Sequence, residues 1–179
     1  MSETYRLKVA GLERDLNICP LNENLSIAGF IMFSDVELTK ACAEALLKKV
    51  PEFDVMLTAE SKGIPLAYEM ARQSGKNYFV ARKMHKLYMK NPTVVEVKSI
   101  TTEAVQTLYL DEADIEAIRG KRLLLVDDVI STGESIHALE VIAEAANANI
   151  VGRATVLAEG DAADRDDIVY LEPLPLFFK

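Results

Sequence analysis

Two adjacent carboxylates, Asp127 and Asp128, directly follow the continuous apolar run of residues 123–126. This order is typical of a strand that is buried on both faces of a parallel sheet and emerges at its carboxyl end. A turn rich in hydroxyls and glycine comes next, and apolar residues at helical spacing between Ile136 and Ala146 predict a helix after it. Ligands bind at the carboxyl ends of strands in open α/β sheets, and free N–H groups at a helix start favour an anion. We therefore expect a phosphate site at this turn.

The carboxylates need a role different from that of the turn. Because a carboxylate repels a phosphate, we expect Asp127 and Asp128 to contact ligand hydroxyls or a metal ion. The alternative interpretation is structural: Ser131 or Thr132 could cap the helix, and the acids could be ordinary strand-end residues. The order of all these features together favours the phosphate site. A Walker-type loop is excluded because no Gly-Lys-Ser/Thr follows the strand, and no Gly-x-Gly-x-x-Gly indicates a dinucleotide site.

Residues 123–133 resemble the PRPP-binding motif of type I phosphoribosyltransferases, where PRPP is 5-phosphoribosyl-1-pyrophosphate. The family motif is an apolar strand, Asp-Asp, an apolar pair and small-Thr-Gly-small-Thr; this chain departs from it at Glu134 and Ser135. The resemblance implies that Asp127 and Asp128 are catalytic, since they would hold the ribose hydroxyls and face the cation that develops at the ribose C1. It also implies that the 5-phosphate is bound by the residues that follow: Val129, Ile130, Ser131, Thr132, Gly133, Glu134 and Ser135.

A second anion site is expected at residues 59–63, where a strand, a turn with Lys62 and a helix start follow one another. On its own this segment could be a solvated turn. It resembles the pyrophosphate-binding loop of purine phosphoribosyltransferases, which often holds a non-proline cis peptide, here expected between Ser61 and Lys62. Residues 82–86 match the Arg-Lys-x-x-Lys run of the adenine-type enzymes, and cations suit a leaving group on which negative charge builds. The resemblance thus assigns pyrophosphate binding to Glu60, Ser61, Lys62, Gly63, Arg82, Lys83 and Lys86.

Residues 84–110 are expected to form a flexible loop or arm, because residues 93–99 and 106–110 alternate like two strands. An arm that serves only structure or dimer contacts is an equal alternative. By resemblance, the segment folds over PRPP and excludes water. Adenine-type enzymes carry a loop glutamate that helps to protonate or orient the base, and Glu103 stands near that position. Lys98 is the competing candidate, as a loop cation near the pyrophosphate.

The elements that must position these residues fit one α/β domain over residues 1–179, a length that can bury a proper core. Strands that alternate with helices predict a mostly parallel sheet with helices on both faces, as in the type I phosphoribosyltransferase fold. Residues 1–33 and 159–179 are expected to form a small hood over the site. Ser34 and Glu37 form a capping-box pattern, which predicts a helix start at this point.

The composition narrows the class of protein. A formal net charge of −8 argues against a general nucleic-acid binder or a binder of anionic membranes. No apolar run approaches membrane-spanning length, and the first residues contain no apolar signal core. Cys19 and Cys42 lie in no metal-ligand spacing, so we expect two reduced thiols in a cytoplasmic protein.

The resemblance implies a purine phosphoribosyltransferase, which transfers phosphoribosyl from PRPP to a purine base and yields a nucleoside monophosphate and pyrophosphate in purine salvage. Adenine is the first expectation and xanthine or another purine the second, since 6-oxopurine enzymes typically carry a lysine where residues 158–161 have none. Mg²⁺ is expected as the cofactor, held through PRPP and water and by no direct protein ligand, and a homodimer is expected. The alternatives are a PRPP-sensing regulatory protein on the same fold and an orotate transferase.

Overall fold

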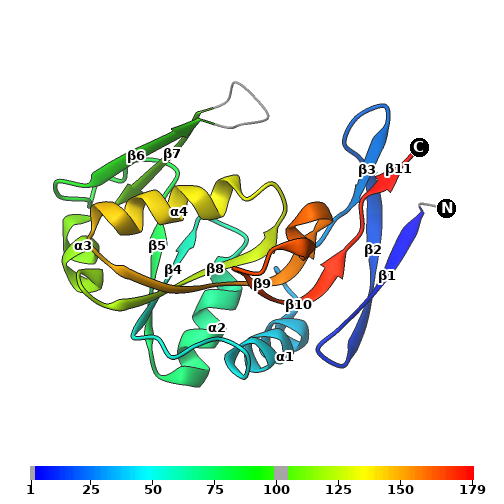
Figure 1. Cartoon of the computed structure of the whole chain (residues 1–179), viewed down its shortest axis with the longest axis horizontal. Coiled ribbons are helices and arrows are strands. Elements are labelled where there is room, and N and C mark those ends of the chain that lie inside the picture. The colour runs from blue at the N-terminus through cyan, green and yellow to red at the C-terminus, as the bar shows by residue number, and fades with distance from the viewer. Residues whose placement is uncertain (1–2, 99–104) are drawn as a thin grey trace.

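The computed structural model describes residues 3–98 and 105–179, which form three sheets and the helices between them (Figure 1). The first strands are β1 (Thr4–Val9), β2 (Leu12–Pro20), β3 (Leu25–Ala28), β4 (Val55–Ala59) and β5 (Asn77–Ala81). The later strands are β6 (Thr93–Lys98), β7 (Val105–Leu110), β8 (Arg122–Ile130), β9 (Asn149–Glu159), β10 (Val169–Leu174) and β11 (Phe177–Phe178). The helices are α1 (Val36–Leu47), α2 (Ile64–Ser74), α3 (Glu112–Ile118), α4 (Glu134–Ala145) and the 3₁₀ helix η1 (Gly160–Asp164).

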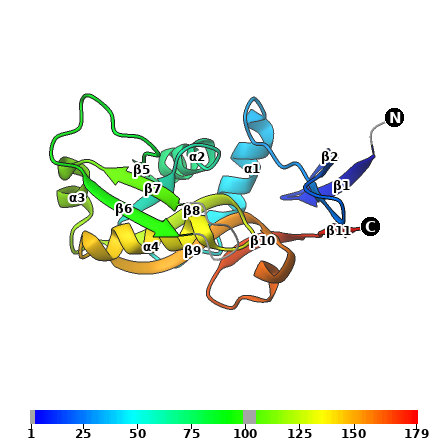
Figure 2. The same cartoon turned by 90° about the horizontal axis from the view of Figure 1, so that it is seen from above.

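The central sheet has five strands in the order β10-β9-β8-β4-β5, and every neighbouring pair is parallel. Along β8, Leu124 and Val126 belong to one hydrophobic core and Leu123 and Leu125 to the other. Helices α1 and α2 cover one face of the sheet, and α4 covers the opposite face (Figure 2). A strand between two cores must be apolar on both sides, so the predicted mostly parallel sheet with helices on both faces is confirmed.

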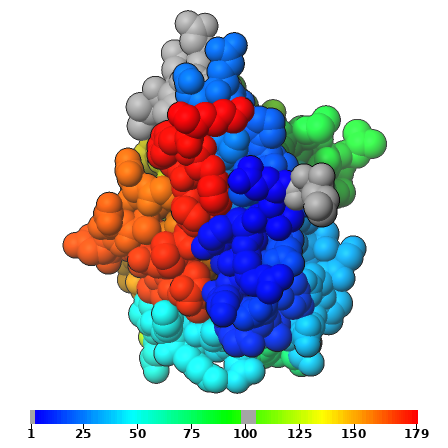
Figure 3. Space-filling model, turned by 90° about the vertical axis from the view of Figure 1, so that its right-hand side faces the viewer, coloured from blue at the N-terminus to red at the C-terminus, as the bar shows by residue number. Residues whose placement is uncertain are grey.

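A second sheet, in the order β1-β2-β3-β11, lies at one end of the molecule beside β10 (Figure 1). Its first hairpin turns at Ala10 and Gly11, whose positive φ angles of 50° and 77° are those that a tight hairpin turn requires. The last strand pairs Phe177 with Ser26, so the first and last segments of the chain lie side by side on this surface (Figure 3). The C-terminal segment therefore divides between two sheets, because β10 continues the parallel sheet and only β11 joins the antiparallel one.

Helix α1 begins one residue later than the capping-box pattern predicts. Ser34 has a φ of 67°, whereas a capping residue needs an extended backbone, and the side chain of Asp35 instead accepts a hydrogen bond from Leu38 N at 3.0 Å. The Arg14 guanidinium lies 2.7 Å from the same carboxylate. The predicted cap at Ser34 is therefore wrong, because the left-handed backbone of Ser34 does not suit a cap and Asp35, which also pairs with Arg14 of β2, caps the helix instead.

The two strands predicted in the arm are confirmed as the antiparallel pair β6 and β7. Val95, Leu108 and Leu110 are buried in the same core as α4, so the base of the arm packs against the domain. Glu103 lies outside the described residues, and the closing movement of the arm stays a prediction. Within the part of the chain that the structure describes, no helix is long and apolar enough to cross a membrane.

Candidate active site

The carboxyl ends of β4 and β8 bring the two predicted loops together. Thr58 of β4 pairs with Val126 of β8, so the chain leaves both strands at the same edge of the sheet. A cavity of about 360 Å³ lies between the loops. It is lined by Ala59, Glu60, Ser61, Lys62, Lys83, Asp127, Asp128, Val129 and Ser135. Residues assigned from three separate segments of sequence thus line one cavity.

Both acids of the pair are shielded from solvent, with Asp127 half-buried and Asp128 more deeply buried. Asp128 is buried at 2% exposure, and its backbone N–H donates to Asp127 Oδ1 at 2.8 Å. Asp128 Oδ2 accepts no hydrogen bond from any described residue, and Lys62 Nζ lies 3.6 Å from it. A buried carboxylate oxygen without a hydrogen bond carries a large desolvation penalty, which a ligand hydroxyl would relieve.

Burial raises the pKa of Asp127. Repulsion from the Asp128 carboxylate and a hydrogen bond with it add to the effect, while the charge of Lys62 opposes it.

Gly63 explains how closely the first loop approaches β4 and β8. A Cβ on Gly63 would stand 2.5 Å from Thr58 Oγ1 and 3.2 Å from Asp127 Oδ1. Only a residue without a side chain fits this contact, so glycine is required here for steric reasons, and its predicted part in pyrophosphate binding stays a prediction.

The first loop contains a cis peptide bond between Glu60 and Ser61, one residue before the predicted position at Ser61 and Lys62. The bond lies where the chain leaves β4 and where Glu60 N donates to Ala81 O at 2.9 Å. Strand β4 ends at Ala59, so this backbone bond to the end of β5 ties down Glu60 as the first residue of the turn.

The Glu60 side chain lines the cavity, and its carboxylate also contacts two of the predicted cationic residues. Its Oε1 lies 3.1 Å from Arg82 Nη2, and Lys83 N donates to its Oε2 at 3.0 Å. The hydrogen bond from Arg82 is the main reason that the pKa of Glu60 is lowered, and Lys86 adds a smaller electrostatic effect. The structure thus brings the predicted cations Arg82, Lys83 and Lys86 to the same loop, with Arg82 already paired.

Arg82 also joins the site to the arm. Its backbone N–H and C=O exchange 2.8 Å hydrogen bonds with Tyr109 of β7. Its Nη1 donates to the Tyr88 hydroxyl at 2.7 Å. Neither tyrosine was predicted from the sequence, since their spacing carries no signal of a contact with Arg82. The arm is therefore anchored at a residue of the candidate site.

The turn of residues 131–135, which we call the phosphate loop, leads from β8 into α4. Gly133 has a φ of 83°, and α4 starts directly after it without a side-chain cap, which leaves backbone N–H groups for a ligand. Ser135 faces the main cavity, whereas Thr132, Gly133 and Glu134 line a neighbouring cavity of about 240 Å³. Ile130 is buried at 2% exposure, so its side chain belongs to the core and only its backbone could meet a ligand.

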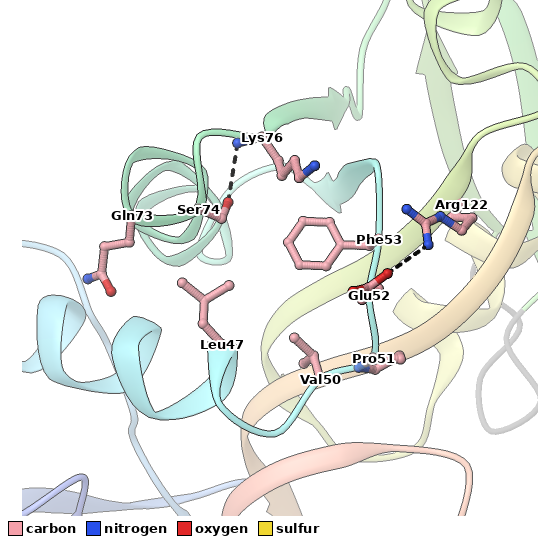
Figure 4. Close-up of a pocket in the computed structure, with 9 residues that line it drawn as sticks. All are labelled: Leu47, Val50, Pro51, Glu52, Phe53, Gln73, Ser74, Lys76 and Arg122. Carbon is pink, nitrogen blue, oxygen red and sulfur yellow. Dashed lines mark hydrogen bonds and ion pairs between the residues drawn. The ribbon is translucent and has the colours of Figure 1, made fainter.

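A larger cavity of about 460 Å³ lies at the opposite edge of the sheet (Figure 4). Phe53, Lys76 and Arg122 are among the residues that line it. Arg122 is already paired, with Asp54 Oδ1 at 2.9 Å and Glu52 Oε2 at 3.2 Å. This cavity contains no predicted site residue and lies at the amino ends of the strands, so we place the candidate site at the carboxyl edge.

The comparisons with known proteins identify the family of this chain. Residues 35–174 match the family model described as phosphoribosyl transferase domain. The chain belongs to the phosphoribosyltransferase family. Adenine phosphoribosyltransferase from Rhodococcus jostii is 33% identical over 127 residues, which cover 70% of this chain and 69% of the relative. The purine biosynthesis transcriptional repressor PurR from Bacillus subtilis is 29% identical over 113 residues, covering 63% of this chain and 39% of the repressor.

The fold is also that of a solved phosphoribosyltransferase. The crystal structure of adenine phosphoribosyltransferase from Thermoanaerobacter pseudethanolicus superimposes with a TM-score of 0.73 at 19% identity and covers 88% of this chain and 95% of that one. At this identity the similarity concerns the fold. Together with the family match over residues 35–174, it confirms the type I phosphoribosyltransferase fold that the sequence motif implies.

The residues present suit a magnesium ion only when PRPP supplies most of the ligands. In the described ranges, no group of three or more histidine, cysteine, aspartate or glutamate side chains could hold a metal ion. Asp128 Oδ2, which accepts no hydrogen bond from the described residues, is one oxygen that this site could offer to the ion, directly or through water. Mg²⁺ prefers oxygen ligands and retains several waters, so a site completed by phosphate oxygens fits this donor set.

Proposed function

We propose that this phosphoribosyltransferase uses adenine and acts in purine salvage. PRPP and adenine would give adenosine monophosphate and pyrophosphate. The observation that supports this proposal most is the position of the acid pair, which faces the cationic loop across one cavity. The name of the Rhodococcus relative and the Arg-Lys-x-x-Lys run at residues 82–86 support adenine as the base.

In the proposed reaction, the bond from the ribose C1 to a pyrophosphate oxygen breaks, a bond from C1 to a base nitrogen forms, and that nitrogen loses its proton to the pyrophosphate or to water. While the first bond breaks and before the second is complete, the ribose passes through an oxocarbenium-like state. Asp127 and Asp128 would accept hydrogen bonds from the ribose hydroxyls and stabilise the positive charge at C1. Lys62 and Lys83, which line the same cavity, would stabilise the negative charge that builds on the leaving pyrophosphate. The phosphate loop would bind the 5-phosphate through backbone N–H groups.

Further parts of the proposal concern the surroundings of the site. Mg²⁺ would be held chiefly through PRPP and water, with Asp128 Oδ2 as an available protein oxygen, and would partly neutralise the charge of the pyrophosphate. The antiparallel sheet of β1, β2, β3 and β11 would act as a hood, and the arm would close over PRPP and exclude water. We also propose a homodimer that works in the cytoplasm on PRPP and a purine base, with no nucleic-acid or membrane partner.

A second candidate is a PRPP-sensing regulator, which the similarity to the repressor PurR favours. Such a protein would bind PRPP at the same cavity without transferring it to a base. The chain matches only 39% of that repressor, and its net charge of −8 disfavours direct contact with nucleic acid. Transfer to xanthine or orotate is the remaining alternative.

The deciding experiment measures pyrophosphate release from PRPP and Mg²⁺ with adenine, hypoxanthine, guanine, xanthine and orotate, offered one at a time. We expect turnover with adenine. Turnover with another single base would correct the substrate and keep the reaction. PRPP binding by calorimetry without turnover on any base would support the regulator, and the absence of both binding and turnover would contradict the proposed site.

A further inference from the structure

Arg165, at the end of η1, lies against the phosphate loop. Its Nη1 is 2.8 Å from the position that a Cβ on Gly133 would occupy. Gly133 needs to be glycine for its φ of 83°, and the guanidinium at the end of the Arg165 side chain lies in the space directly beside it. Arg165 is separated from the loop by about thirty positions in sequence and belongs to no motif, so only the tertiary structure places it here.

Asp167 fixes the orientation of this guanidinium. Arg165 Nε donates to Asp167 Oδ1 at 2.8 Å and Nη2 donates to Oδ2 at 2.7 Å. This fork occupies one edge of the guanidinium and directs Nη1 toward Gly133. The Arg165 side chain is 32% exposed, so its position depends on the fork rather than on deep burial.

The other charged groups of the neighbouring cavity have partners of their own. Glu140 pairs with Arg153 and with His137, whose Nδ1 lies 3.2 Å from its Oε2. Arg153 Nε also lies 3.7 Å from Asp167 Oδ2. The pair of Arg165 and Asp167 therefore stands with its positive end toward the loop and its negative end toward a second cation. This arrangement places positive charge at a loop in which Glu134 introduces a carboxylate.

We propose that Arg165 is a positioning residue for the 5-phosphate end of PRPP. It holds the phosphate loop at Gly133 and sets a guanidinium behind the backbone N–H groups that would bind the phosphate. Donors that are fixed before the ligand arrives bind it more tightly than donors that must first be ordered. This inference rests on the proposed function and adds to it a residue outside both sequence motifs.

The test compares Arg165→Met, which keeps length but removes charge and the fork, with Arg165→Lys, which keeps the charge. We expect Arg165→Met to raise the KM for PRPP by about five- to tenfold, with kcat and the KM for adenine within about twofold of wild type. Arg165→Lys should recover part of the loss. The matched control is Arg119→Met at the end of α3, an arginine that pairs with Glu116 at 2.7 Å; α3 lies at the opposite end of α4 from the phosphate loop (Figure 1).

Binding of ribose 5-phosphate, measured by calorimetry, separates this inference from the proposed reaction. We expect Arg165→Met to weaken ribose 5-phosphate by the same factor as PRPP and to leave pyrophosphate binding unchanged. Asp167→Asn, which loosens the fork, should give part of the same effect and serves if Arg165→Met folds poorly. Ribose 5-phosphate affinity within about twofold of wild type in both variants would overturn the inference.

The two failures remain distinguishable. If wild-type protein binds ribose 5-phosphate, loses that affinity in Arg165→Met and transfers to no base, the proposed reaction fails and the role of Arg165 stands. If wild-type protein transfers to adenine and Arg165→Met does so with an unchanged KM for PRPP, the role of Arg165 fails and the reaction stands. If wild-type protein binds neither PRPP nor ribose 5-phosphate, both are overturned.

Discussion

Lys62 Nζ lies 3.6 Å from Asp128 Oδ2, so the cation of the first loop contacts the buried member of the acid pair across the candidate site. The Lys62 side chain is 54% exposed and that of Asp128 only 3%. Lys62 can therefore leave this contact at little cost when a ligand enters, whereas Asp128 stays in place. In the proposed reaction these two residues contact opposite ends of the bond that breaks.

We expect Lys62→Met to weaken pyrophosphate binding by about tenfold, because it removes one charge-assisted contact to the leaving group. The free energy of unfolding should change by less than about 0.5 kcal/mol, since the ion pair is long and its lysine exposed. Calorimetry with pyrophosphate and thermal unfolding check the two parts. Lys48→Met, which removes an exposed lysine 2.8 Å from Glu44 on α1, is the control and should leave pyrophosphate binding unchanged.

Asp128→Asn should lower kcat by about 10²-fold or more while the protein stays folded, because the ribose cation loses its buried negative partner. Circular dichroism and a melting curve monitor the fold, and pyrophosphate release monitors turnover. Asp166→Asn, at an exposed position, is the matched control. Near-normal turnover in Asp128→Asn would remove the mechanism given above.

The raised pKa of Asp127 predicts a pH-dependent gain of stability in Asp127→Asn. A carboxyl group whose pKa is higher in the folded than in the unfolded chain binds more protons when folded, so wild-type stability falls as the pH rises above about 4. Because asparagine cannot ionise, the stability of the variant does not fall with pH for this reason. We expect the variant to gain about 1–2 kcal/mol over wild type at pH 8 and little near pH 4. A stability difference that does not change with pH would contradict this account.

Gly63→Ala should destabilise the protein by about 1–3 kcal/mol and reduce turnover, because the added Cβ would stand 2.5 Å from the buried Thr58 Oγ1. Gly29→Ala is the control, since its Cβ would meet its nearest neighbour, Asn17 O, at an ordinary 3.6 Å. Urea unfolding and a turnover assay on both variants give the comparison. Equal stability of the two variants would show that the loop has room to move away from β4 and β8.

Glu103→Gln should lower kcat by about ten- to a hundredfold if this residue protonates or orients the base, which is the usual size for a general acid or base. Steady-state rates with saturating PRPP and adenine measure the effect. Glu96→Gln, at an exposed position of β6, controls for the loss of one negative charge from the arm. An unchanged rate would move the role to another residue of the arm, with Lys98 next to be tested.

The local sequence was sufficient to predict a strand or a helix wherever a single segment contains the complete pattern of buried residues. The apolar run before Asp127 requires a strand covered on both faces, because apolar side chains on alternate sides need two cores. The strands and helices between residues 54 and 157 follow for the same reason, since the period of apolar residues displays the buried face directly.

The tertiary structure decided what depends on contacts between distant segments. Asp35, which pairs with Arg14 of β2, caps α1 instead of Ser34, and the cis peptide lies one residue earlier than predicted, where Glu60 N donates to the end of β5. The tertiary structure also pairs Arg82 with Glu60 and places Arg165 against Gly133. A short motif fixes the types of the groups at a site, whereas the pairing of side chains from separate loops depends on strand register and packing, which no single segment contains.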